Sequence, residues 1–136
     1  MLEICIKEVP LSGIKTPEQL AAFVMESLGL SELKDERDVR FFLAFLEHKE
    51  GLRAEDLMKI SKLGQTATYA RIRKLLNAGI IYKAKGGVYK LRERTLSDTL
   101  DFRVRKDIER VFSSIVEVAE ELDKKLLEKK KITKSY

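Results

Sequence analysis

The sequence predicts a mainly α-helical protein with one small β-hairpin and a long C-terminal helix. Three observations lead to this fold class. Residues 64–79 have apolar side chains at the three- and four-residue spacing of a helix with one buried face. Residues 80–91 contain two short apolar and aromatic runs around a Gly-Gly pair. From Val104 to Leu122, apolar residues recur at alternating intervals of four and three, and neither Gly nor Pro follows Leu100.

The helix predicted over 65–78 has two different faces. Its buried face is formed by Ile72, Leu75 and Leu76, with Thr68 one turn earlier. Its other face is polar and basic, and comprises Gln65, Thr66, Arg71, Arg73 and Lys74. Gly79 ends the helix, because glycine adopts the left-handed conformation common at helix C-termini.

The two runs that follow predict a hairpin. Residues 80–82 and 88–91 read as strands, and Lys85-Gly86-Gly87 connects them with residues that tolerate positive φ. A basic amphipathic helix followed by a small basic hairpin is the pattern of a winged helix-turn-helix. In that fold the helix enters the DNA major groove and the hairpin, or wing, lies along the backbone.

Composition excludes several classes of function. Cys5 is the only cysteine and His48 the only histidine, so no intrachain disulfide or Cys/His zinc site can form, and we expect neither a cofactor nor an enzyme. No apolar run approaches the roughly 20 residues of a membrane span, and there is no charged-then-apolar leader, which predicts a soluble cytoplasmic protein. Charged residues make up 36% of the chain, a composition typical of heat-adapted proteins.

Positive charge is concentrated in one part of the chain. Residues 1–50 carry 6 basic and 10 acidic side chains, residues 51–92 carry 10 and 2, and residues 93–136 carry 11 and 10. The excess of eight positive charges therefore lies in the segment with the helix and the hairpin. Such clustering is expected for a polyanionic partner, because neutralised phosphates release their counterions.

The N-terminal part, residues 1–30, is predicted to be an extension outside the winged-helix domain. Alternation of apolar and polar residues over 2–6 suggests a short strand, and Thr16-Pro17-Glu18 has the features of a helix start. Gly29 would end this helix. Its apolar face is expected to comprise Leu20, Phe23, Val24 and Leu28.

Residues 31–92 are expected to form the domain itself. A core helix runs from about Ser31 or Asp35 to Lys49, with Val39, Phe42, Leu43 and Leu46 on one stripe, widened by Phe41 and Phe45. After the turn at 51–53 comes a short helix over 54–60, followed by a tight turn over 61–64 that contains Gly64. A short helix, a tight turn and a longer basic helix together have helix-turn-helix spacing.

These residues carry a resemblance to a known family. Residues 36–92 resemble the winged-helix domains of archaeal and bacterial transcription regulators of the MarR and TrmB type, through the segments 54–57, 72–81 and 86–91. The resemblance implies a sequence-selective regulator whose second helix reads the major groove of double-stranded DNA. By position, the resemblance places that surface on the helix at Gln65, Thr66, Tyr69, Arg71 and Lys74, and on the wing at Lys83 and Lys85. Arg73, on the same basic face, is a further candidate for DNA binding. Arg53 and Lys62 would hold phosphates.

Two other functions fit the same pattern. Ala67 and Ala70 lie among the groove-facing positions and cannot hydrogen-bond a base edge, which favours backbone and shape recognition. A low-specificity architectural or chromatin protein is therefore one alternative. A winged-helix module that binds another protein and not DNA is the second.

Residues 93–136 are predicted to be a dimerisation helix with a basic tail. Ser97 is a plausible N-cap, and the segment 97–130 would form a coiled-coil-like helix. Because its apolar seam is too long for one small domain to cover, we expect a homodimer. The predicted seam comprises Val104, Ile108, Val111, Ile115, Val118 and Leu122. The direction of pairing and any small-molecule effector remain open.

Overall fold

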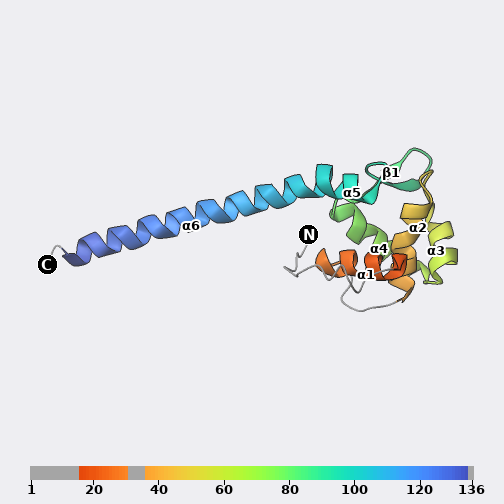
Figure 1. The fold of residues 1–136 in the computed structure, drawn as a ribbon, viewed down its shortest axis with the longest axis horizontal. Coiled ribbons are helices and arrows are strands. Elements are labelled where there is room, and N and C mark those ends of the chain that lie inside the picture. Colours follow the sequence, from red (N-terminus) through yellow and green to blue (C-terminus); the bar gives the residue numbers. More distant parts are fainter. Residues whose placement is uncertain (1–15, 31–35, 135–136) are drawn as a thin grey trace.

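A computed structural model describes residues 16–30 and 36–134, with side chains placed up to residue 130. Figure 1 shows a compact group of helices with a small hairpin, from which one long helix extends. We call residues 16–30 and 36–92 the head, and the long helix α6 (Arg105–Lys134) the stalk. The strand predicted over 2–6 lies outside the described residues.

Helix α1 (Pro17–Ser27) begins as the sequence predicts. The Thr16 side chain accepts a hydrogen bond from the Gln19 backbone at 3.1 Å, and the Gln19 side chain accepts one from the Thr16 backbone, which completes a capping box. At the other end Gly29 has φ +68° and Leu30 N–H donates to the Met25 carbonyl, a Schellman motif. The predicted apolar face is confirmed for Val24 and Leu28, which pack against the core, and is wrong for Leu20, which is exposed. The fully buried residues of the helix are Ala21 and Met25.

Helix α2 (Glu36–Glu47) provides the centre of the core. Phe41, Phe42 and Phe45 are almost fully buried, and the rings of Phe41 and Phe45 meet edge to face with centroids 5.6 Å apart. Helices α1 and α3 both pack against it. The helix ends two residues before Lys49, and its predicted start at 31–35 lies outside the described residues.

Helices α3 (Ala54–Ser61) and α4 (Gln65–Asn77) are joined by a three-residue turn, 62–64. Lys62 has φ +61°, and Leu63 turns inward to become buried. The predicted buried face of α4 is confirmed for Thr68, Ile72 and Leu75. Its end at Gly79 is also confirmed, because Gly79 has φ +76° and Ile80 N–H donates to the Leu75 carbonyl in a second Schellman motif.

The hairpin pairs strands β1 (Ile81–Ala84) and β2 (Val88–Leu91) antiparallel. Ala84 pairs with Val88, so the connection is a three-residue loop, in which Gly86 and Gly87 both have positive φ. The first strand begins one residue later than predicted, because Ile80 completes the end of α4. Strand β1 contacts α4, and β2 contacts α2.

A third backbone segment joins this sheet through a single residue. Leu52, between α2 and α3, exchanges both backbone hydrogen bonds with Tyr89, at 2.9 and 2.8 Å. The sequence predicts only a turn here, because one bridging residue gives no alternating pattern. The bridge anchors the hairpin to the start of α3.

The stalk is continuous with two short segments, α5 (Leu96–Thr99) and a π-helical turn, η1 (Leu100–Val104). Thr95, not Ser97, is the N-cap, and its hydroxyl accepts from the Asp98 backbone at 3.1 Å. Leu96, Leu100, Val104 and Ile108 all pack on the head at four-residue spacing. In a regular α-helix, residues four apart are rotated by about 40° relative to one another, so a row at this spacing would drift around the axis. The π turn has more residues per turn, and this keeps the four side chains on the same side of the helix.

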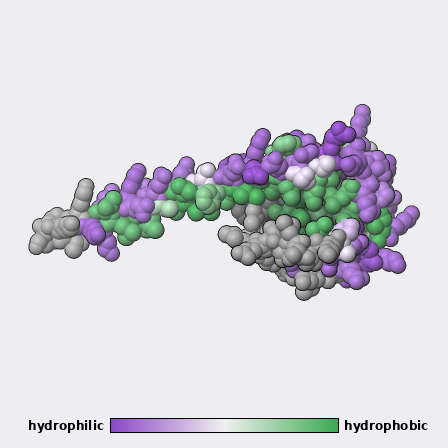
Figure 2. Space-filling model, in the orientation of Figure 1, coloured by the Kyte–Doolittle hydropathy of each residue, from purple (hydrophilic) through white to green (hydrophobic). Residues whose placement is uncertain are grey.

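Beyond Ile108, α6 leaves the head with an uncovered apolar face. Figure 2 shows green side chains along one side of the stalk and purple ones along the other. The large exposed apolar residues of this face are Val111, Phe112, Ile115, Val116, Val118, Leu122, Leu126 and Leu127. In the part of the chain that the structure describes, no helix has the length and apolarity to cross a membrane.

Candidate nucleic-acid interface

The uncovered face of α4 is the centre of the candidate site. The residues it exposes are Gln65, Thr66, Tyr69, Ala70, Arg73, Lys74 and Asn77. Arg73 and Thr66 lie about one hundred degrees or more from the buried row in the helical projection, so they point away from the core. The helix carries three basic and no acidic residues. This face can therefore meet an anionic partner without rearrangement of the head.

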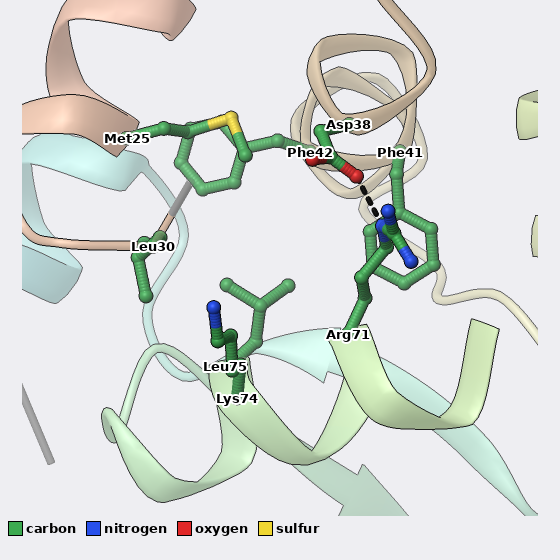
Figure 3. A pocket seen from close by; sticks show the side chains of 8 residues that line it. All are labelled: Met25, Leu30, Asp38, Phe41, Phe42, Arg71, Lys74 and Leu75. Carbon is green, nitrogen blue, oxygen red and sulfur yellow. Dashed lines mark hydrogen bonds and ion pairs between the residues drawn. The ribbon is translucent and has the colours of Figure 1, made fainter. Parts of the chain in front are cut away.

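Arg71 was predicted to lie on the DNA-binding face of α4, but in the structure its side chain is turned toward α2. Its guanidinium forms an ion pair with Asp38 of α2 and donates a second hydrogen bond to the Ala67 carbonyl at 3.1 Å (Figure 3). The side chains of Arg71 and Asp38 are only 29% and 14% exposed. Arg71 thus joins α4 to α2. Ala67 also packs against the core, so of the two small residues only Ala70 is on the exposed face.

The Arg71–Asp38 pair borders a small cavity between α1, α2 and α4. Met25 and Leu30 close one side, and Phe42 and Leu75 form its apolar wall, as Figure 3 shows. The cavity volume is about 20 Å³, roughly the space of a single water. Lys74 lies at the cavity's opening and remains exposed. A cavity of this size holds no effector, so we regard it as packing around the ion pair.

We expect Arg71 and Asp38 to stabilise the head together. In a double-mutant cycle of Asp38→Ala and Arg71→Ala, the coupling free energy should be about 1 kcal/mol, between the values typical of exposed and buried pairs. Urea unfolding at about 0.1 M salt measures it. A coupling free energy below about 0.3 kcal/mol would show that the pair contributes no more to stability than an exposed surface ion pair.

The two ends of α3 expose two of the predicted phosphate contacts. Arg53, at the start of α3, and Lys62, in the turn, are both exposed. The Asp56 carboxylate accepts a hydrogen bond from the Arg53 backbone at 3.1 Å, and Ser61 Oγ accepts one from Leu63 N at 3.4 Å. These bonds fix the backbone on which both cations are carried.

The hairpin places its two predicted cations differently. Lys85 lies in the exposed loop, beside Gly86 and Gly87, where it can reach a partner freely. Lys83 is also exposed, but it lies over the ring of Tyr89, with Nζ 5.9 Å from the ring centroid.

The structure reveals a second basic surface that the sequence analysis did not select. A groove beside the hairpin is lined by Lys49, Tyr82, Lys90, Leu91, Arg92, Glu93 and Arg94. Tyr82 pairs with Lys90 across the two strands, so both side chains lie on the same side of the hairpin. In the sequence, the alternation of side chains along each strand was the signal that could have placed Tyr82 and Lys90 on one face of the hairpin. Glu93 is engaged by Arg103 at 2.9 Å, which leaves the groove strongly basic.

The predicted dimerisation residues divide into two groups. Val104 is 1% exposed and lies in the core of its own subunit, and Ile108 is partly covered there. Both residues attach the stalk to the head. Because Val104 is fully buried there, the prediction that it lies in the pairing surface is wrong. Val111, Ile115, Val118 and Leu122 are all exposed, as a pairing surface requires.

Groups suited to catalysis are not gathered among the described residues. His48 contacts Glu50 at 3.2 Å on the surface, and the pKa of Glu50 is lowered chiefly by its backbone hydrogen bond and then by that of His48. No group of three or more His, Cys, Asp or Glu residues suited to a metal ion occurs within 16–30 and 36–134.

Comparison of the chain with protein families, with curated proteins and with solved structures finds no match in any of the three.

Proposed function

We propose that this protein is a winged helix-turn-helix that binds double-stranded DNA, with α4 in the major groove and the β1–β2 hairpin as the wing. The observation that carries the proposal is the basic face of α4, which stays uncovered although the other face is packed into the core. The order of elements supports it: a core helix, a one-residue bridge, a short helix, a tight turn, a second helix and a hairpin.

The side chains available on α4 determine what kind of recognition is expected. Thr66, Arg73 and Gln65 can hydrogen-bond bases or phosphates, whereas Ala70 offers only a close approach to the duplex. Arg71 is engaged by Asp38 and is left out of the reading set. Because few of these side chains can hydrogen-bond base edges and the surface is basic, we expect contacts to phosphates and to the shape of the duplex to contribute much of the recognition.

We further propose that the stalks pair two copies, and that the dimer is a transcription regulator. Pairing covers the exposed seam residues Val111, Ile115, Val118 and Leu122, which would otherwise remain in water. A two-fold dimer presents two heads to two half-sites. The exposed Ala70 favours a second candidate, an architectural protein with little sequence preference.

Selection of bound duplexes from a random pool tests these proposals together. A regulator should enrich a motif with two half-sites, bound about 1,000-fold or more tightly than random duplex. An architectural protein should bind all duplexes within about tenfold of one another. Absence of binding to any duplex at about 50 mM salt would overturn DNA binding and leave the head as a protein-interaction module.

A further inference from the structure

The heptad series of the stalk lead to two lysines. In the seam, Ile108, Ile115 and Leu122 recur every seven residues, and so do Val111 and Val118. The next residues in these two series are Lys129 and Lys125. Both positions therefore face the partner if the heptad continues. Whatever lies opposite them must accommodate two positive charges.

Parallel pairing in register would bring like charges together. It places Lys125 against Lys125 and Lys129 against Lys129 of the other copy, because equivalent seam residues meet. Residues 111–123 contain four acidic and no basic side chains, whereas residues 124–130 contain four basic and one acidic. A parallel pair would align each segment with its own copy, which opposes association.

The base of the stalk offers a complementary surface. A groove there has an apolar floor of Leu28, Leu100, Val104 and Ile108, and its rim carries Asp98, Asp101, Arg105 and Glu109. Arg105 is already paired with Asp101 at 2.6 Å, so Asp98 and Glu109 leave the rim acidic. The groove ends at Ile108, one helical turn before Val111, where the uncovered apolar face of the stalk begins. An apolar, basic helix end fits this groove.

We propose that two copies of this chain pair their stalks antiparallel, so that the basic end of each lies along the acidic groove at the base of the other. This inference rests on the proposed pairing and adds its direction and register. Antiparallel helices pack the two seam series against each other, which sets Val111 opposite Leu122 and Ile108 opposite Lys125 of the other copy. Lys125 and Lys129 then lie near Asp107, whose side chain is about half exposed.

Disulfide trapping tests the direction. In a Cys5→Ser background, one chain carries Val111→Cys and another Leu122→Cys, and the two are mixed, equilibrated and oxidised. The antiparallel pair should give disulfide-linked heterodimer from the mixture and no linked dimer from either chain alone. Equivalent cysteines would then be about 16 Å apart along the axis, far beyond the reach of a disulfide.

Each other outcome is decisive. Linked homodimers from each chain alone would show parallel pairing and overturn this inference while leaving the dimer proposal intact. A dimer by sedimentation with no linkage in the mixture would overturn the register. A monomer at about 100 μM would overturn the pairing itself, and duplex binding by that monomer would show that the DNA-binding proposal survives separately.

Charge exchange tests the contact between the stalk end and base. Lys125→Glu and Asp107→Lys should each weaken dimerisation several-fold, and the double variant should restore it to within about twofold of the natural chain. In a parallel pair these positions lie about 27 Å apart, so the double variant would show no rescue. Asp107 also contacts Arg110 at 3.2 Å, and Arg110→Ala is the control for loss of that local pair.

Discussion

Replacing Arg73 and Lys85 with alanine is expected to weaken duplex binding about 10- to 100-fold at about 0.1 M salt. Arg73 is one of the two exposed cations of α4, and Lys85 is the cation of the hairpin loop, so the variant removes one proposed contact from each element. Each neutralised phosphate contributes about 0.9 to the slope of log affinity against log salt concentration, and the slope should therefore fall by about 1.8. Fluorescence anisotropy of a labelled duplex across a salt series measures both quantities.

The matched control removes two charges from elsewhere. Lys106 and Lys124 lie on the polar side of the stalk, opposite its apolar face, and both are exposed. Lys106→Ala/Lys124→Ala lowers net charge equally and should change the slope by less than about 0.3. Equal slopes for the two double variants would mean that binding follows total charge, and the α4 and wing assignment would be lost.

Gly51→Ala is expected to destabilise the protein by about 3 kcal/mol, because strain in a left-handed backbone adds to overpacking. Gly51 has φ +100°, which disfavours any L side chain. An added Cβ would overlap Val88 Cγ1 and lie 2.8 Å from Lys90 Cγ and 3.1 Å from the Tyr89 carbonyl. The Leu52–Tyr89 bridge holds these strands in place, so the clash cannot be relieved without moving the hairpin.

Thermal and urea unfolding measure this effect, with a melting temperature lower by roughly 10 °C. Gly64→Ala is the control, because Gly64 has φ −73° and, among the described residues, no neighbouring atom lies within 4 Å of an added Cβ. Gly64 is the N-cap of α4, and its replacement should cost about 1 kcal/mol, because alanine caps a helix less well than glycine. Similar costs for both variants would show that the hairpin gives way easily and is not fixed by the bridge.

Local signals in the sequence were enough to predict several elements. The capping residues of α1, the glycine that ends α4 and the Gly-Gly loop of the hairpin act within a few residues, and the structure confirms all three. The buried row of α4 follows from its spacing in the same way. Each of these features depends on backbone conformation or on the period of a single helix.

The functional roles of the basic residues depend on long-range contacts. Arg71 and Arg73 are identical in type and two residues apart, but only Arg71 meets Asp38, 33 residues away in the sequence. Similarly, Val104 continues the heptad of the stalk but is buried by the head. The spacing of residues in the sequence shows which of them share a helix face. It does not show which part of that face is covered by the rest of the same subunit.

The π turn at 100–104 sets the direction in which the stalk displays its apolar strip. Arg105 N–H donates to the Leu100 carbonyl, so this turn holds one residue more than an α-helical turn would. Without that residue, the strip beyond Ile108 would be rotated by about 100° around the helix axis relative to α4. In the proposed dimer, the winding of this single turn would set how the two α4 surfaces are oriented toward one duplex, although the turn itself would touch neither the duplex nor the partner.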